Sequence, residues 1–175
     1  AMADLMNADV DLIFYDTTSL HFEVDEEDEA ELGKRERRYP AQRKRGHSKN
    51  GRSDAPQIVI GLAVTRDGLP VRSWVFPGNT ADVTTVERVK NDLRGWRLGR
   101  CVFVGDAGMN SEENRRSLSL GAGKYILAAK MRAGDEVTHE VLTRPGRYHA
   151  LKENLRVKEV TVGDGERKRR YVVCH

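Results

Sequence analysis

The apolar residues of this chain fall into short runs separated by polar and turn-forming residues, and these runs predict β-strands. The strongest is Gln57–Thr65, which is rich in β-branched residues. Residues 66–68 (Arg-Asp-Gly) are a tight-turn signal and residues 69–76 form a second run, so together they predict a β-hairpin. Residues 11–18 predict another strand, whose contiguous apolar residues are typical of a strand buried on both faces.

Helical and strand patterns then alternate along the chain. Asn79 or Thr80 can cap a helix that has Asp82 in its first turn and apolar residues at helical spacing up to Gly95. Asn110 or Ser111 can cap the next helix, which begins with acidic residues. The predicted order is strand, insert, strand, strand, helix, strand, helix and strand, at residues 11–18, 23–55, 57–65, 69–76, 83–93, 100–105, 110–120 and 125–129. This order predicts an α/β fold in which helices pack on the faces of a mixed sheet.

The pattern changes after residue 130. Leu155–Val162 and residues 167–174 predict two strands around a Gly-Asp-Gly-Glu turn, and they form a second hairpin with a basic arm. We therefore expect a core domain at residues 10–130 and a β-rich subdomain at residues 131–175. The chain stops directly after its last strand pattern, which is unusual for a natural domain, so we expect a fragment of a longer protein.

Charge is separated along the chain more strongly than the net charge of +3 suggests. Residues 23–31 contain seven acids and no base, whereas residues 34–52 contain nine bases and one acid. The stretch 23–55 has few apolar residues and predicts a long charged insertion that is flexible or ordered only by a partner.

Cysteine content and hydropathy indicate the compartment. The two cysteines, Cys101 and Cys174, do not form a disulfide framework, which favours a reducing environment. The sequence has neither a signal-peptide pattern nor an apolar run long enough to cross a membrane. We expect a soluble, cytoplasmic protein.

Two aspartates, Asp16 and Asp106, each follow a short apolar, strand-like run. A carboxylate at the end of a buried strand is costly unless a divalent metal, a helix N-terminus or a basic partner compensates its charge. Two such carboxylates side by side are typical of a site that holds hard metal ions for phosphoryl-transfer chemistry. The alternative is that each aspartate only caps a turn, which is a common role of this residue.

Four sequence blocks combine into a recognisable pattern. They are residues 15–20 (Tyr-Asp-Thr-Thr-Ser-Leu), 45–49 (Arg-Gly-His-Ser-Lys, followed by Asp54 and Gln57), 75–80 (Val-Phe-Pro-Gly-Asn-Thr) and 105–109 (Gly-Asp-Ala-Gly-Met). In this order they resemble bacterial insertion-sequence transposases of the insertion-sequence-four superfamily. The resemblance covers nearly the whole chain and implies an RNase H-like fold with an Asp–Asp–Glu catalytic triad.

The resemblance implies that Asp16 is the first catalytic aspartate and metal ligand and that Asp106 is the second, on neighbouring strands. Two Mg²⁺ or Mn²⁺ ions held there would activate a water or a DNA 3′-hydroxyl and stabilise the leaving oxygen. The third member is a glutamate in a Tyr–Arg–Glu–Lys-type signature, which this chain lacks. Glu112 and Glu113 follow Asp106 too closely to replace it. We therefore expect a catalytic-core fragment with an incomplete site and little or no activity of its own, whose terminal hairpin begins the family's β-rich insertion.

The basic block has two interpretations. One is a solvated charged loop, and the other is a contact with the DNA backbone, which the neighbouring phosphodiester-cleaving site favours. The predicted DNA-binding residues are Arg43, Lys44, Arg45, His47, Lys49 and Arg52. A hypothesis from charge alone is that the acidic block shields the basic block when DNA is absent.

The resemblance also implies partners and a location. Transposon ends and target DNA are the expected partners, a homodimer is expected for the full-length protein, and no membrane is involved. The expected location is the bacterial cytoplasm, at the nucleoid. Two alternatives stay open: a catalytically silent DNA-binding module, and an RNase H-like nuclease that shares the fold and the metals.

Overall fold

The computed structural model describes residues 12–29, 31–32, 38–48, 51–95, 101–120, 123–131 and 136–175. The chain divides into two compact units, Ala1–Ala128 and Ala129–His175. None of the helices in the described ranges has the length and apolar character that crossing a membrane requires.

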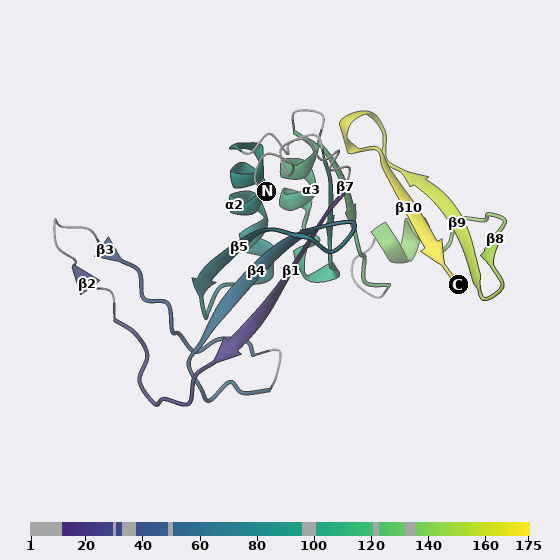
Figure 1. The fold of residues 1–175 in the computed structure, drawn as a ribbon. Coiled ribbons are helices and arrows are strands. Elements are labelled where there is room, and N and C mark those ends of the chain that lie inside the picture. The colour runs from purple at the N-terminus through teal and green to yellow at the C-terminus, as the bar shows by residue number, and fades with distance from the viewer. Residues whose placement is uncertain are drawn as a thin grey trace. The chain divides into compact units, whose positions relative to one another are not determined.

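The first unit is built on a five-stranded sheet with the order β5-β4-β1-β6-β7 (Figure 1). Its strands are β1 (Leu12–His21), β4 (Gln57–Thr65), β5 (Pro70–Pro77), β6 (Val102–Gly105) and β7 (Lys124–Leu127). The central strand β1 pairs antiparallel with β4 and parallel with β6, so it joins an antiparallel half to a parallel half. The mixed sheet with its packed helices confirms the predicted RNase H-like α/β fold class.

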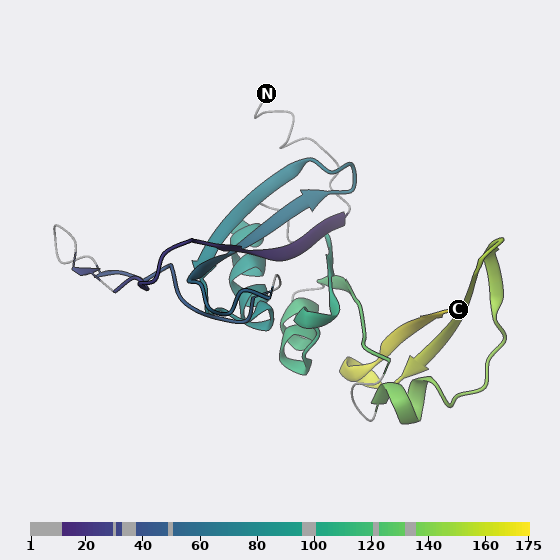
Figure 2. The ribbon, with the colours of Figure 1, turned by 90° about the horizontal axis from the view of Figure 1, so that it is seen from below.

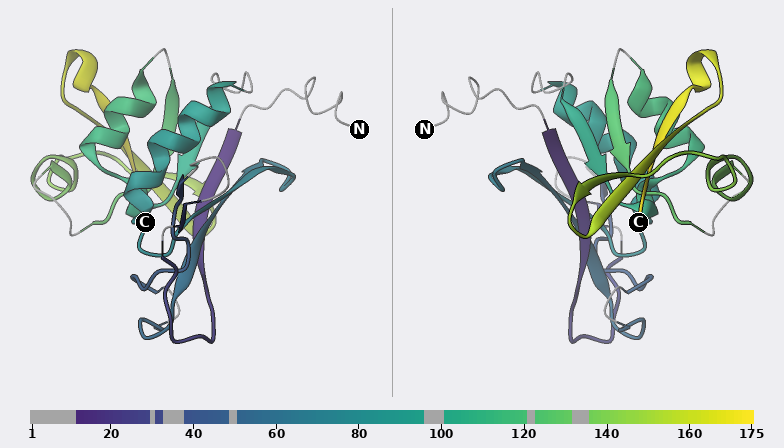
Figure 3. Two further views of the ribbon diagram at one scale, coloured as in Figure 1. Left: turned by 90° about the vertical axis from the view of Figure 1, so that its left-hand side faces the viewer. Right: turned by 90° about the vertical axis from the view of Figure 1, so that its right-hand side faces the viewer.

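Two helices lie on the same side of this sheet (Figure 3). The helix α2 (Asp82–Gly95) buries Val86 and Val89 completely, and α3 (Glu112–Ser119) buries Leu118. These side chains share one apolar cluster with residues of all five strands. Burial of this cluster is the main force that holds α2 and α3 on the sheet, because helix propensity by itself is marginal at such lengths.

Burial alternates strictly along β1. The buried residues are Ile13, Tyr15, Thr17 and Ser19, and the exposed residues between them are Phe14, Asp16, Thr18 and Leu20. The prediction of a strand buried on both faces is therefore wrong for the described part of the chain, where the helices cover one face. The contiguous apolar run was misleading because Phe14, in the middle of it, is 40% exposed between two buried neighbours.

The charged insertion leaves the sheet at the end of β1 and returns at the start of β4 (Figure 2). Lys44 and Gln57 exchange backbone hydrogen bonds of 3.0 Å, and the Gly78 amide donates to the Gln42 carbonyl at 2.9 Å. The buried Gln57 side chain also donates to the carbonyls of Gly78 and His47. The expectation that only a partner would order the insertion is wrong for this segment, because the sheet itself holds it.

Two glycines make this junction sterically feasible. A Cβ at Gly78 would lie 1.9 Å from the Gln57 carbonyl oxygen and 2.2 Å from that of Lys44. A Cβ at Gly46 would lie 2.2 Å from the Gly78 carbonyl oxygen. The three backbone segments approach so closely that no side chain fits between them.

The second unit is a small antiparallel sheet with two short helical turns, η2 and η3 (Gly165–Arg167). Its strands β8 (His149–Lys152), β9 (Leu155–Val162) and β10 (Arg169–Cys174) have the order β10-β9-β8, and the turn η2 spans Glu136–Val141. Val141 packs with two valines of β9, and the Glu136 carboxylate accepts the Tyr171 hydroxyl at 2.6 Å. The predicted hairpin of residues 155–174 is confirmed. The sequence analysis missed β8 and η2.

Replacement of Gly78 by alanine tests the junction. We expect Gly78→Ala to lower the free energy of unfolding of the first unit by about 1–3 kcal/mol or more, because the new methyl group overlaps backbone atoms that cannot rotate away. Urea unfolding followed by tryptophan fluorescence measures this directly, since both tryptophans of the chain, at positions 74 and 96, belong to the first unit. The exposed neighbour Asn79, as Asn79→Ala, is the matched control. Equal midpoints for the two variants would contradict the close approach.

Candidate functional site

Asp16 lies in the middle of β1, at the point where the parallel pairing ends. The last paired residues of β1 and β6 are Phe14 and Val104. Asp16 lies two residues beyond Phe14, and Asp106 lies two residues beyond Val104 and directly after the end of β6. The register of β1 and β6 therefore gives the two aspartates corresponding positions. Beyond this point β1 continues to His21, paired with β4. The sequence analysis placed Asp16 at a strand end; it lies instead at the end of the pairing with β6.

Asp106 is fixed by the turn that follows it. Its Oδ1 accepts the amide N–H groups of Gly108 at 3.0 Å and Met109 at 3.2 Å. This arrangement caps the short helix η1 (Ala107–Met109), and the Met109 side chain is fully buried beneath it. Asp106 therefore does cap a turn, as the alternative interpretation predicted, but the cap engages Oδ1 and leaves the side chain exposed. The cap gives the carboxylate a defined position.

Tyr15, the residue before Asp16 in β1, is part of the apolar core. Its ring is 2% exposed and packs edge-on against Trp74, with centroids 5.8 Å apart. Gly61 on β4 makes room for it, since a Cβ there would lie 2.5 Å from the Tyr15 hydroxyl oxygen. Burial, with smaller contributions from the negative charges of Asp82 and Asp16, raises the pKa of Tyr15 to about 12. The phenol is therefore neutral at physiological pH and lies within electrostatic range of both carboxylates.

A third aspartate, Asp82, is present at the site. It is the first residue of α2, and its Oδ1 accepts the Thr17 hydroxyl at 2.5 Å. A Cβ built on Gly108 would lie 3.4 Å from Asp82 Oδ2 and 3.3 Å from Asp106 Oδ1, so the two carboxylates flank the same small space. From sequence alone Asp82 was only an acid in the first turn of a helix. A contact between residues 65 positions apart has no local sequence signal.

The donor chemistry of Asp16 and Asp106 fits a hard divalent cation, because both groups are exposed carboxylates at corresponding positions. The number of donors is smaller than a complete site needs. Among the described residues, no group of three or more His, Cys, Asp or Glu side chains has an arrangement that would hold a metal ion. The topology thus gives the two predicted ligands corresponding positions, and the described part of the chain adds no third ligand in a metal-holding group.

Three described basic residues of the insertion, Arg43, Lys44 and Arg52, pair with acidic side chains, whereas the Arg45 guanidinium donates to the backbone carbonyls of Asp54 and Asp25. Arg43 binds Asp28 through Nε and Nη2, each at 2.6 Å from Oδ1, and the Arg43 amide donates to Oδ2 at 2.9 Å. Lys44 lies 3.3 Å from Glu27, whose other oxygen accepts the Arg45 amide. This pairing is what the shielding hypothesis requires.

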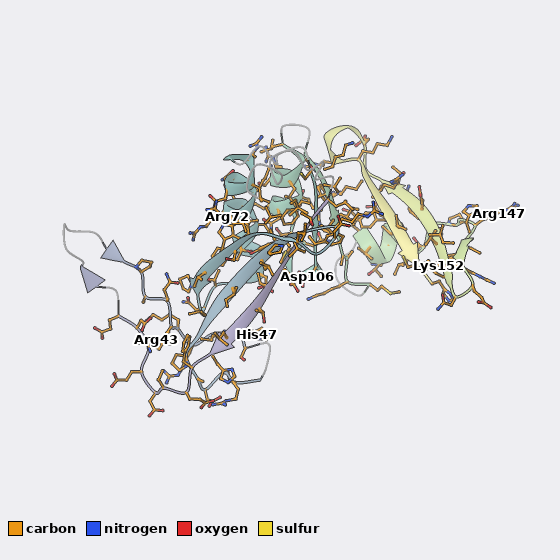
Figure 4. The ribbon with its side chains drawn as sticks, viewed as in Figure 1. Arg43, His47, Arg72, Asp106, Arg147 and Lys152 are labelled. Carbon is orange, nitrogen blue, oxygen red and sulfur yellow. The ribbon has the colours of Figure 1, made fainter. Side chains whose placement is uncertain are left out.

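The rest of the predicted DNA-binding group is more varied. Arg52 pairs with Glu23 and Asp54, each at 3.0 Å. His47 is exposed, and Lys49 lies outside the described residues. Arg43 and His47 lie on the insertion, while Asp106 lies at the end of β6 (Figure 4). Because β1 and β6 are parallel, the insertion and Asp106 both follow the carboxyl ends of strands at the same edge of the sheet.

The comparisons with known proteins add one finding. The family model described as the transposase DDE domain matches residues 13–173. No curated protein and no solved structure matches the chain.

The ion pairs of the insertion predict a titration. The hydrogen bond from the Arg43 side chain holds the pKa of Asp28 below its usual 3.8, so Asp28 favours the folded segment above that pH, and the contribution is lost as the pH falls through the lowered pKa. We expect the carboxyl NMR signal of Asp28 to titrate with a midpoint below 3.8. Arg43→Gln should move the midpoint up toward that value. A midpoint that Arg43→Gln leaves unchanged would show that the pair is absent in solution.

Proposed function

Because the chain belongs to the family of transposase DDE domains, we propose that it forms the catalytic core of a bacterial insertion-sequence transposase, with Asp16 and Asp106 as its catalytic carboxylates. The observation that carries this proposal is the register of β1 and β6, which gives the two residues corresponding positions. The reaction is a polynucleotidyl transfer. Water first breaks a phosphodiester bond at a transposon end, and the freed 3′-hydroxyl then displaces a 3′-oxygen from a target phosphate.

Each aspartate has a distinct part in this proposal. Asp106 is oriented by two backbone amides through Oδ1, so its charge is held at a fixed place on the edge of the sheet. Asp16 is an exposed residue of the central strand, whose backbone is fixed by the pairing with β4. Both are therefore preorganised to hold Mg²⁺ or Mn²⁺. When bound, such an ion supplies activation of the attacking oxygen and charge stabilisation of the leaving oxygen.

The third carboxylate belongs to the same proposal. A complete site of this class needs a glutamate in addition to the two aspartates, and we propose that it comes from a segment outside this chain. The small number of donors among the described residues supports this assignment. The chain by itself would then bind metal weakly and turn over little or no DNA.

A second candidate function is a catalytically silent DNA-binding module. The observation that favours it is the same: the described residues contain no three-donor metal group. The two functions differ in whether Asp16 and Asp106 are needed for metal binding, and hence one measurement separates them.

We propose that the segment around Arg43, Lys44 and Arg45 contacts the DNA backbone. The segment is anchored to the sheet where β1 ends at His21, five residues beyond Asp16, at the end toward which β6 also runs. Its guanidinium and ammonium groups pair with the partly exposed acids Asp28 and Glu27, and ion pairs that water still reaches are weak enough to exchange for phosphates. The acidic residues would then compete with DNA for the same bases.

Substitution of each aspartate tests the first function. We expect Asp16→Asn and Asp106→Asn each to weaken Mn²⁺ binding by more than about 100-fold, the upper end of the effect of residues that only orient a ligand. Titration followed by electron paramagnetic resonance of free Mn²⁺ measures the affinity. Asp67→Asn is the control, because Asp67 is an exposed aspartate in the turn between β4 and β5, at the other end of the sheet.

Two results would decide against the catalytic assignment. Wild-type affinity in both variants would remove Asp16 and Asp106 from the metal site and favour the silent module. Equal losses in Asp67→Asn would mean that the effect comes from net charge and not from ligation.

Neutralisation of the acidic partners tests the DNA contact. We expect Glu27→Gln/Asp28→Asn to tighten binding to duplex DNA about 3- to 10-fold at moderate salt, because the freed bases bind phosphates and release counterions. The slope of log affinity against log salt should steepen by about 1–2. Glu153→Gln/Asp164→Asn, two exposed acids of the second unit, changes the net charge equally and serves as the control. An equal gain in the control would show a general charge effect, which contradicts competition at Arg43 and Lys44.

A further inference from the structure

The start of α2 is connected to both strands that carry the candidate catalytic aspartates. On the β1 side, Thr17 is 4% exposed and donates its hydroxyl to Asp82 Oδ1 at 2.5 Å. Thr17 directly follows Asp16 in the chain, and its amide donates to Asp16 Oδ1 at 2.7 Å. A shift of Thr17 would therefore move the hydrogen-bond donor that orients the Asp16 carboxylate.

On the β6 side, the Asp82 carboxylate lies against the turn that follows Asp106. A Cβ added to Gly108 would lie 3.4 Å from Asp82 Oδ2. The Gly108 amide is one of the two donors that hold Asp106 Oδ1. Asp82 thus contacts a residue adjacent to Asp16 with one oxygen and approaches the cap of Asp106 with the other.

Further hydrogen bonds fix the first turn of α2 in this place. The Thr85 hydroxyl donates to the Asp82 carbonyl at 2.7 Å. The buried Asn114 side chain donates at 2.8 Å both to the Val83 carbonyl and to the Met109 carbonyl, so it ties the start of α2 to the turn that Asp106 caps. The helix start and the Asp106 turn are therefore held as one assembly.

We propose that Asp82 is a positioning residue that sets the distance between the Asp16 strand and the Asp106 turn. The inference rests on the proposed function, since it assigns Asp82 to the same site. Its negative charge is tolerated beside Asp106 because the N-terminus of α2 and the Thr17 hydroxyl both stabilise it. In this role the carboxylate acts as a hydrogen-bond acceptor, and an amide of the same shape can replace it.

The Mn²⁺ titration distinguishes the role of Asp82 as a hydrogen-bond acceptor from the role of its negative charge. Asp82→Ala removes the acceptor and should weaken Mn²⁺ binding about 10- to 100-fold, the effect of residues that orient metal ligands. Asp82→Asn keeps an oxygen that accepts the Thr17 hydroxyl and should stay within about 3-fold of wild type, because the geometry is kept. Thr84→Val is the control: it removes another hydroxyl of the same helical turn, which donates to the Ala81 carbonyl.

A mutant cycle in the metal-free protein tests the coupling itself. Thr17→Val removes the donor on β1, and we expect it to shift the amide NMR resonances of Gly108 and Met109 on the other side of Asp82. In the Asp82→Ala background the same change should cause no further shift, because the connection is already broken. Tryptophan fluorescence of each variant during urea unfolding checks that the first unit stays folded.

The outcomes distinguish this inference from the proposed function. Loss of Mn²⁺ binding in Asp16→Asn and Asp106→Asn, with wild-type affinity in Asp82→Ala, would overturn the positioning role and leave the function intact. Equal losses in Asp82→Asn and Asp82→Ala would also overturn it, because the charge itself would then be required. If Asp16→Asn and Asp106→Asn bind Mn²⁺ normally, the proposed function fails, and the mutant cycle alone decides whether Asp82 couples the two strands.

Discussion

The parallel pairing of β1 with β6 is the interaction on which the candidate site depends. It aligns two residues that are 90 positions apart in the chain, because Asp16 and Asp106 each follow the last paired residue by two. The apolar cluster beneath the sheet holds this register, since a slip of one residue would turn Ile13 and Tyr15 out of the core. The core therefore determines not only the fold but also which carboxylates meet.

The other parts of the first unit gather at the same edge of the sheet. The start of α2 brings Asp82, and the backbone junction at Gly46 and Gly78 brings the basic segment of the insertion. Hydrogen bonds position both Asp82 and the basic segment. Each such bond adds little net stability, but a polar group that is buried without a partner costs considerable free energy. A charged loop is thereby attached to a rigid part of the sheet, at the end toward which both β1 and β6 run.

The sequence predicted those features that leave a local pattern. The hairpins and the cap of α3 at Ser111 were found because periodicity and turn residues mark them, as with the strand Leu155–Val162, whose bounds agree with the structure. The burial of β1 on both faces was a wrong prediction because Phe14 lies exposed inside the apolar run, and β1 also runs three residues past the predicted end at Thr18. Asp82 and the anchoring at Gly78 were missed because contacts made across the fold, through one carboxylate or through backbone atoms, have no signature along the chain. The third carboxylate stays a prediction.

The central claim is that Asp16 and Asp106 hold one metal ion between them. A crystal structure of this chain grown with Mn²⁺, with the ion located by its anomalous scattering, tests it most directly. The account predicts a peak within about 2.1–2.3 Å of one carboxylate oxygen from each aspartate, a distance typical of a hard divalent ion bound to carboxylates. A peak bound to neither residue, or to only one of them with the other turned away, would contradict it.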